Sequence, residues 1–323
     1  MNATAPVLDI RNLTKRFGEF TALDNLTLSL ERGQILGFIG PNGAGKTTTI
    51  KILVGAMRPT SGTATIAGAD CVRDARRIKR LVGFMPDTFG AYDNMRVREY
   101  LDFFGAAFAI PRRVRAKRID EVLETTGSGW MQDRYVEALS HGMKQRIGVA
   151  RTLLHDPEML ILDEPANGLD PQARIEMRDL LLKLAGMGKT LIVTSHILPE
   201  LSRICDVVAI ITQGKLRAFG TLDQIMRDLR QQRTFEIQLC GSAQVDAAAT
   251  AVREALEPGE RDGVRALATE SLVRFDTARS DTELSAILAT LVGRRIDVAQ
   301  FREIPKDLED AFLSVTRREA PAA

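Results

Sequence analysis

The feature that most constrains this chain is a glycine-rich loop that follows directly on a short apolar run. Residues 34–39 read Gln-Ile-Leu-Gly-Phe-Ile, and residues 40–47 continue as Gly-Pro-Asn-Gly-Ala-Gly-Lys-Thr. The apolar run predicts a buried strand, and residues 47–54 predict a helix that ends at Gly55. Glycines between them let backbone N–H groups turn inward around an anion, because side chains there would block its approach. This pattern is typical of a loop that holds the phosphates of a nucleotide.

The loop residues have separate expected tasks. Lys46 is expected to reach the β- and γ-phosphates, and the Thr47 hydroxyl is expected to ligate Mg²⁺. A glycine-rich turn with an exposed lysine is the alternative, and it requires the rest of the sequence to carry no related motif. The residues expected to contact the nucleotide are Gly40, Pro41, Asn42, Gly43, Ala44, Gly45, Lys46, Thr47 and Thr48.

Composition narrows the class of protein. The chain has 323 residues, 45% of them hydrophobic and 27% charged, so it can bury one large core and a smaller one. Its apolar runs fall short of the roughly 20 residues that span a bilayer, and its first residues do not resemble a secretory signal. We therefore expect a cytoplasmic protein. A net charge of +2 is too small for a dedicated nucleic-acid binder, so no nucleic-acid partner is expected.

Two domains are predicted from the order of the elements. Residues 1–230 begin with an antiparallel hairpin within 7–30 and contain a helical segment at about 90–155. Short strands are expected at 35–39, 63–66 and 81–85. From residue 159 onward strands at 159–162, 191–194 and 207–211 alternate with helices, among them a long one at 173–184, which predicts a mainly parallel sheet covered by helices.

Residues 231–323 have a different character. Their predicted order is β-α-β-β-α-β, which indicates a small α+β domain of the ferredoxin-like type. Asp281 is expected to cap the second helix, and a last helix is expected to carry Leu308, Phe312 and Leu313. No motif here carries chemistry, so a regulatory or dimerisation role is the simplest assignment.

Two adjacent carboxylates follow another apolar run. Residues 159–162 predict a buried strand, and Asp163 and Glu164 come directly after it. Open α/β sheets bind ligands at the carboxyl ends of their strands. We expect Asp163 to hold Mg²⁺ beside Thr47, and Glu164 to polarise a water for attack on the γ-phosphate. A surface turn is the alternative, but downstream of a phosphate loop the catalytic interpretation is favoured.

Five motifs in this order resemble the nucleotide-binding subunit of an ATP-binding cassette (ABC) transporter. They are the loop at 40–47, Leu-Ser-His-Gly-Met-Lys-Gln at 139–145, the acids at 163–164, Asn-Gly-Leu-Asp at 167–170, and Ser-His at 195–196. The resemblance covers about residues 7–229. It implies the α/β fold of a P-loop NTPase cassette, with a mainly parallel sheet core, an N-terminal antiparallel β subdomain and a helical subdomain.

The resemblance assigns roles to further residues. Ser140 and Gly142 belong to the signature motif, which grips the γ-phosphate of ATP held by a second copy, and a helix start suits an anion. Ser140 also suits a helix cap. Asp170 resembles the acid that communicates across this interface, although beside Pro171 it also suits a helix N-cap. His196 resembles the switch histidine at the γ-phosphate, and a purely structural histidine is its alternative.

Some positions depart from the family's pattern. Phe17 matches the aromatic residue that stacks on adenine, normally tyrosine, with core packing as the alternative. Asp87 stands where the family usually has glutamine, in the segment that links Mg²⁺ and the attacking water to the membrane partner. An aspartate can contact Mg²⁺ but is shorter and cannot donate a hydrogen bond. His141 and Met143 replace the glycine and glutamine that are common in the signature.

The function implied by the resemblance is ATP hydrolysis coupled to export. The chain is expected to dimerise around two ATP molecules and to power a separate transmembrane permease from the cytoplasmic face of the membrane. The tail at 308–313 resembles that of ATPases from drug, lipid and polysaccharide exporters. The expected catalytic residues are Glu164, His196 and Lys46, and the expected Mg²⁺ ligands are Thr47, Asp163 and Asp87.

Two other function classes compete with this one. A soluble ABC-type ATPase that acts on the ribosome or DNA usually has two tandem cassettes or a long coiled-coil insertion. This chain has one phosphate loop and no sustained heptads, which counts against that class. A module that senses ATP without hydrolysing it is disfavoured by Glu164 and His196.

Overall fold

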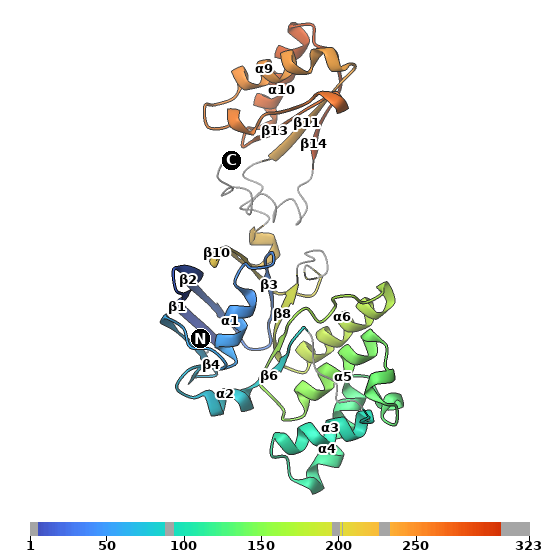
Figure 1. The fold of residues 1–323 in the computed structure, drawn as a ribbon. Coiled ribbons are helices and arrows are strands. Elements are labelled where there is room, and N and C mark those ends of the chain that lie inside the picture. The colour runs from blue at the N-terminus through green and yellow to red at the C-terminus, as the bar shows by residue number, and fades with distance from the viewer. Residues whose placement is uncertain (1–5, 88–93, 196–200, 202, 226–232, 305–323) are drawn as a thin grey trace, which may run out of the picture. The chain divides into compact units, whose positions relative to one another are not determined.

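A computed structural model describes residues 6–87, 94–195, 201, 203–225 and 233–304. The chain divides into two compact units, Met1–Leu222 and Asp223–Ala323 (Figure 1). Each unit has its own hydrophobic core. His196 and the helix expected around Leu308 to Leu313 lie outside the described residues.

The first unit is built on a six-stranded sheet in the order β10-β9-β3-β8-β7-β6. Five strands are parallel and β10 runs antiparallel to β9. Every residue of β3, β7 and β8 is buried, which explains why these strands are continuous apolar runs rather than alternating ones. The strands are β3 (Ile35–Ile39), β6 (Val82–Met85), β7 (Met159–Leu162), β8 (Thr190–Ser195), β9 (Val207–Thr212) and β10 (Lys215–Gly220).

A second, antiparallel sheet has the order β2-β1-β4-β5. In β2 the leucines are buried, whereas Asn25, Thr27 and Ser29 between them are exposed, as expected for a strand with one solvated face. The apolar core lies between the two sheets and includes residues of α1 (Lys46–Leu53). The strands are β1 (Leu8–Phe17), β2 (Phe20–Leu30), β4 (Ser61–Ile66) and β5 (Ala69–Asp70). This sheet is the predicted N-terminal antiparallel subdomain.

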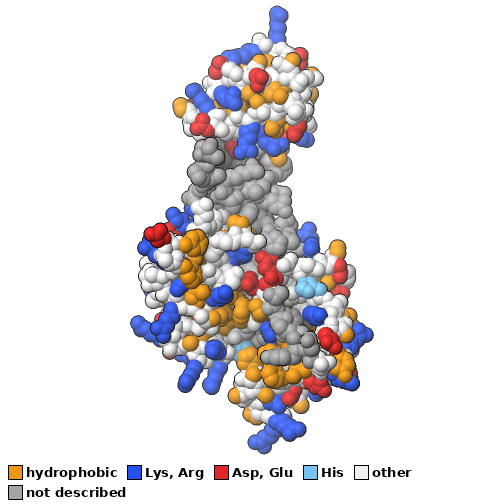
Figure 2. Space-filling model, viewed as in Figure 1, with side chains coloured by type: hydrophobic (Ala, Val, Ile, Leu, Met, Phe, Trp, Pro, Cys, Tyr) orange, Lys and Arg blue, Asp and Glu red, His pale blue; other side chains and the backbone are white. Residues whose placement is uncertain are grey.

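The other helices that the structure describes in full within the first unit cover the sheet or form the helical subdomain. They are α2 (Ala75–Leu81), α3 (Val97–Ala107), α4 (Arg112–Thr125), α5 (His141–Leu153) and α6 (Pro171–Gly186), with single turns η1 (Gly129–Met131) and η2 (Val136–Ala138). Lys and Arg side chains project over α2 in Figure 2. Within the described part of the chain, none of the helices combines the length and apolarity needed to cross a membrane.

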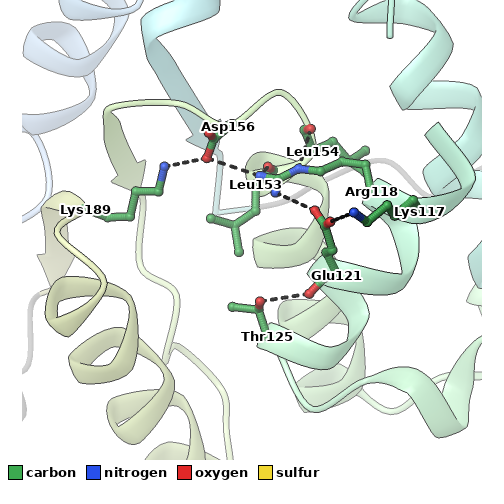
Figure 3. A network of polar contacts seen from close by, with 8 residues as sticks. All are labelled: Lys117, Arg118, Glu121, Thr125, Leu153, Leu154, Asp156 and Lys189. Carbon is green, nitrogen blue, oxygen red and sulfur yellow. Dashed lines mark hydrogen bonds and ion pairs between the residues drawn. The ribbon is translucent and has the colours of Figure 1, made fainter. Parts of the chain in front are cut away.

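A polar network ties the helical subdomain to the sheet (Figure 3). The guanidinium of Arg118, on α4, donates to the carbonyl oxygens of Leu153 at 2.7 Å and Leu154 at 3.0 Å, where α5 ends. It also contacts Asp156 at 3.2 Å, and Asp156 accepts a 2.7 Å hydrogen bond from Lys189, just before β8. A cation is favourable at this end of α5 because the last carbonyls of a helix are unpaired and carry partial negative charge.

The second unit contains a four-stranded antiparallel sheet in the order β12-β13-β11-β14. With two helices the chain order is β-α-β-β-α-β, the predicted ferredoxin-like arrangement. Asp281 was predicted to cap α10, which is wrong, because Ser280 is the N-cap and exchanges hydrogen bonds with Glu283 in a capping box. The elements are β11 (Arg233–Leu239), η3 (Ser242–Gln244), α9 (Val245–Ala255), η4 (Arg261–Gly263), β12 (Arg265–Leu267), η5 (Ala268–Glu270), β13 (Leu272–Thr277), α10 (Asp281–Gly293) and β14 (Val298–Ile304).

One carboxylate is buried in this second sheet. Glu236, on β11, is 3% exposed and lies opposite Arg274 of β13 and Arg302 of β14. Its two oxygens accept hydrogen bonds of 2.7 Å from Arg274 and 2.6 Å from Arg302. The bond from Arg274, with that from Arg302, holds the pKa of Glu236 below its ordinary value in spite of burial. The charge of Glu236 is therefore balanced by neighbouring strands of the same sheet.

Candidate functional site

The glycine-rich loop joins β3 to α1 and has the backbone that the sequence requires. Gly45 has a φ of +109° and Gly43 a φ of +79°, in the region that favours glycine. A Cβ on Gly45 would lie 2.7 Å from a methyl carbon of Leu23, and one on Gly40 would overlap the carbonyl oxygen of Ile211. The loop therefore tolerates no side chain at Gly40 or Gly45, and its backbone can wrap closely around an anion.

Lys46 begins α1 and folds back over this loop. Its ammonium donates to the carbonyl oxygens of Gly40 at 2.5 Å and Pro41 at 3.3 Å, and the side chain is buried. Burial lowers the pKa of Lys46, while the negative charges of Glu164 and Asp163 act in the opposite direction. An ammonium held by carbonyl oxygens at the loop is in reach of an anion that the loop would hold.

A turn between β9 and β10 braces the loop from the side. The N–H of Gly214 donates to the carbonyl oxygen of Ala44, and the carbonyl oxygen of Gly214 accepts from the N–H of Asp24, both at 2.9 Å. Gly214 has a φ of +75°, and a Cβ there would lie 2.7 Å from the carbonyl oxygen of Ala22. The phosphate loop is thus bonded to this turn, and the turn is bonded to β2.

The loop forms one wall of a cavity of about 320 Å³. Phe17 and Phe20, which pair across the β1–β2 turn, are 48% and 64% exposed. Core packing, the alternative for Phe17, is therefore wrong. Phe20 was missed, although two aromatic residues that flank one hairpin turn were a signal for an exposed apolar surface. The lining residues are Phe17, Phe20, Ala22, Pro41, Asn42, Gly43, Ala44, Gly45, Lys46, Thr47, Thr48, Asp87, Asp163 and Glu164.

Asp163 and Glu164, which directly follow β7, also line this cavity. Asp163 is 8% exposed, so the surface-turn alternative is wrong for it. Burial raises the pKa of Asp163, and the charges of Glu164 and Asp87 add to this, against a hydrogen bond from Thr194 and the charge of Lys46. The negative charge of Asp163 is thus disfavoured by its own surroundings. A cation bound in the cavity would relieve this electrostatic cost.

Thr194, near the end of β8, contacts both acids. Its hydroxyl donates a 2.6 Å hydrogen bond to Oδ1 of Asp163 and accepts a 2.9 Å bond from the backbone N–H of Glu164. Glu164 itself has a φ of +52°, in the left-handed region. Sequence analysis missed Thr194, because a threonine within an apolar strand gives no signal of its partners.

The residues expected to hold Mg²⁺ fit that ion by their chemistry. Thr47, Asp87 and Asp163 all line the same cavity and offer hydroxyl and carboxylate oxygens. Oxygen atoms of this kind are the ligands that Mg²⁺ prefers in proteins, where one or two carboxylates act together with the phosphates of a substrate.

Two residues that depart from the family's pattern meet at Asn167. The side-chain amide of Asn167 donates to Asp87 at 3.4 Å, and its backbone carbonyl oxygen lies 2.9 Å from Nε2 of His141. Because a carbonyl oxygen only accepts, Nε2 of His141 carries the proton. The structure therefore connects Asp87, which lines the cavity, with the first residue of α5.

Ser140, Gly142 and Asp170 are not among the described residues that line this cavity. Ser140 is the N-cap of α5 and accepts from the N–H of Met143 at 3.4 Å, and Gly142 packs against α6, so that a Cβ there would lie 3.2 Å from that of Ala173. Asp170 is the N-cap of α6 and accepts from the N–H of Ala173 at 2.9 Å. The capping roles given as alternatives for Ser140 and Asp170 are confirmed. The unpaired N–H groups at the start of α5 remain suited to an anion.

Comparison with known proteins agrees with this geometry. A family model described as "ABC transporter" matches residues 23–167. The Nod factor export ATP-binding protein I of Ralstonia nicotianae is 36% identical over 323 residues, which covers 98% of this chain and 95% of that protein. The bacitracin transport ATP-binding protein BcrA of Bacillus licheniformis is 41% identical over 234 residues, or 72% of this chain and 75% of that protein.

Solved structures lead to the same class. A structure titled as the ATP binding subunit of an ABC transporter aligns with a TM-score of 0.63 and 29% identity, over 69% of this chain and 93% of that one. The fold and the site together define an ATP-binding cassette of the P-loop NTPase type. The chain belongs to the ABC transporter family, in which it is an ATP-binding subunit with ATPase activity.

Proposed function

We propose that this chain hydrolyses ATP to power export through a permease on a separate chain, and that it does so as a homodimer around two ATP molecules. The observation that carries the proposal is that the phosphate loop, Asp163 and Glu164 all line one cavity. The relatives named for Nod factor export and bacitracin transport support a role in transport rather than on the ribosome or DNA. The site of action is then the cytoplasmic face of the membrane.

In this proposal the loop and Lys46 bind the phosphates. The ammonium of Lys46 exchanges the carbonyl oxygens of Gly40 and Pro41 for phosphate oxygens, and Phe17 stacks on the adenine. Thr47, Asp163 and Asp87 would hold Mg²⁺, which when bound supplies positive charge against the phosphates. Glu164 orients and polarises the attacking water.

A second copy of the chain completes the site. Ser140, Gly142 and the free N–H groups at the start of α5 do not line the cavity of their own chain, so they are free to bind the γ-phosphate held by the partner. Asp170, at the start of α6, contacts the partner, and His196 contacts the γ-phosphate. Residues 1–230 form the ATP-binding domain, and residues 231–323 regulate or stabilise the dimer.

Glu164→Gln tests the hydrolytic part of the proposal. The amide cannot accept the proton of the attacking water, so the rate of hydrolysis should fall by about 10²- to 10⁴-fold while ATP still binds. The variant should then accumulate as an ATP-bound dimer, which analytical ultracentrifugation with and without ATP would detect. Glu158→Gln is the matched control, because Glu158 precedes the same strand at its other end and pairs only with the exposed Arg32 among the described residues. Wild-type turnover in Glu164→Gln would contradict the proposal.

Fractionation tests the site of action. The full chain should be expressed together with a neighbouring reading frame that encodes a polypeptide with about six apolar segments of membrane-spanning length. We expect the chain to be recovered in the membrane fraction of these cells. Deletion of that frame should release it. Sedimentation with ribosomes, unaffected by the deletion, would instead favour the soluble class of ABC-type ATPase.

A further inference from the structure

We propose that Thr194 is a positioning residue for ATP hydrolysis, because its one hydroxyl holds both acids of the site. The inference rests on the proposed function, in which Asp163 holds Mg²⁺ and Glu164 orients the water. Thr194 need not touch nucleotide or metal for this role. It acts by setting the orientation of the Asp163 carboxylate and the backbone from which the Glu164 side chain projects.

The hydrogen bonds leave the hydroxyl one orientation. A threonine hydroxyl has a single proton, and Thr194 gives it to Oδ1 of Asp163 at 2.6 Å. Its oxygen then accepts the N–H of Glu164 at 2.9 Å. Thr194 is fully buried and Asp163 nearly so, which limits the competition of water for these bonds. The two acids are therefore coupled through one atom.

The backbone of Glu164 depends on this contact. A residue other than glycine is rare at a φ of +52° and is held there only when its surroundings compensate the cost. The N–H of Glu164 donates to Thr194, and its carbonyl oxygen accepts from the N–H of Asn167 at 3.0 Å. Both peptide groups that flank its Cα are thus bonded. Loss of the Thr194 hydroxyl would free one of them and change the direction of the carboxylate.

The position of Thr194 in the sheet explains why its hydroxyl reaches both Asp163 and Glu164. β8 lies between β3, which leads into the phosphate loop, and β7, which leads into the acids. Thr194 is paired in register with Phe38 of β3, and the preceding residue Val193 with Leu162 of β7. The hydroxyl is therefore carried by the strand between the two halves of the site.

A buried threonine can also serve the fold alone, and the same strand offers a control for that. Thr190 begins β8, is equally buried, and accepts a 3.0 Å hydrogen bond from the N–H of Gly33. It lies at the end of the strand that is remote from the acids. Thr190→Val and Thr194→Val make the same chemical change in the same strand, so a structural role predicts the same consequence for both.

The experiment compares Thr194→Val, Thr194→Ser and Thr190→Val in the full-length chain. Thr194→Val should lower kcat for ATP by about 10- to 100-fold, the range seen when groups that orient metal ligands are removed, and change KM much less. Thr194→Ser keeps the hydroxyl and should retain kcat within about threefold of the wild type. Thr190→Val should leave kcat unchanged, although thermal unfolding shows a loss of stability like that of Thr194→Val.

A second readout is independent of turnover. Binding of a fluorescent ATP analogue, titrated with Mg²⁺, should require about 10-fold more Mg²⁺ in Thr194→Val than in Thr190→Val, because the Asp163 carboxylate is no longer oriented. If Thr194→Val is too unstable to purify, Thr194→Ala takes its place. Equal kcat and equal Mg²⁺ dependence in the two valine variants would overturn the inference. A fully active Glu164→Gln would instead refute the proposed function, so the two failures are distinguishable.

Discussion

Each unit of this protein buries a carboxylate beside the strands of a sheet, but the surroundings of the two differ. Glu236 in the second unit accepts hydrogen bonds from Arg274 and Arg302, and its pKa is lowered. Burial raises the pKa of Asp163 in the first unit, and the charges of Glu164 and Asp87 add to this against the charge of Lys46. Burial alone would raise the pKa of both groups. The difference comes from the charges that each sheet places next to the acid.

The comparison distinguishes a charge that is balanced within its own unit from one that is not. The second sheet supplies both counter-ions of Glu236 from adjacent strands, so the charge is balanced within the unit. In the first unit the ammonium of Lys46 is bonded to carbonyl oxygens of the loop, and the acids repel one another. A ligand that brings positive charge to Asp163 and Glu164, and an anion to the loop, would balance the charges of this site. Electrostatic cost that remains in a cavity is typical of functional sites.

The largest effect on this comparison is expected from Lys46→Ala. Removal of the ammonium takes away charged hydrogen bonds to phosphate, each of about 1.5 to 3 kcal/mol, so ATP affinity should fall by about 100-fold. The stability of the nucleotide-free protein should change little, because the hydrogen bonds of the Lys46 ammonium go to carbonyl oxygens of the loop. Calorimetric titration measures the affinity. Lys51→Ala, an exposed lysine on the same helix, is the control and should bind ATP as the wild type does.

Glu236→Gln should have the reverse profile. The neutral amide loses two charge-assisted hydrogen bonds in a buried position, which should lower the free energy of unfolding of the second unit by about 1 to 3 kcal/mol. Hydrogen exchange of peptides from β11 and β13 measures this loss, and the intrinsic rate of ATP hydrolysis should not change with it. Glu303→Gln on the same sheet pairs with Arg233 at the surface and should cost much less. Equal losses in the two variants would show that the arginines do not balance Glu236.

Lowering the pH should reduce the loss of stability that Glu236→Gln causes in the second unit. Because the folded-state pKa of Glu236 lies below its unfolded value, its stabilisation is complete above the unfolded pKa of about 4.3 and is lost as the pH falls through the folded pKa. The stability difference between the wild type and Glu236→Gln should therefore shrink as the pH falls from about 6 to about 3. Urea titrations followed by hydrogen exchange of the same peptides would measure it. A difference that grows on acidification would contradict the assignment of a lowered pKa.

The smallest effect is expected from His141→Gly, which restores the residue common in the family's signature. The variant loses the 2.9 Å hydrogen bond between His141 and the carbonyl oxygen of Asn167, at an exposed position. One such bond contributes about 1 kcal/mol, so kcat should fall by no more than about fivefold. Steady-state kinetics beside Glu137→Gln, an exposed neighbour outside the site, measures the change. A rate equal to that of Glu137→Gln would show that the contact with Asn167 does not support catalysis.

The sequence predicted the features that depend on neighbouring residues. The phosphate loop, the acids after β7 and the order of strands and helices all follow from local patterns, because the glycines, the carboxylates and the apolar runs that define them are contiguous. The cavity confirms that Lys46, Asp163 and Glu164 come together. The ferredoxin-like order of the second unit was predicted in the same way.

Features that depend on distant partners were missed. Thr190 and Thr194 look alike in the sequence, and only the fold places the hydroxyl of Thr194 beside acids that lie about 30 positions earlier. In the sequence, Glu236 is only one polar residue of an alternating strand. The strand register, which places Arg274 and Arg302 opposite it, identifies it as a paired charge. The cap of α10 is a different case. Ser280 followed by Glu283 is a capping box that was readable from the sequence and was overlooked in favour of Asp281.

Helix α5 is bonded at both of its ends. His141 at its start contacts Asn167, and the carbonyl oxygens of Leu153 and Leu154 at its end accept from Arg118. A helix of 13 residues is about 20 Å long and is stiff over that length. We therefore expect α5 to move as one body. A displacement of Arg118 along the axis of α5 would therefore act on a continuous helix of about 20 Å whose other end contacts Asn167, the residue that donates to Asp87.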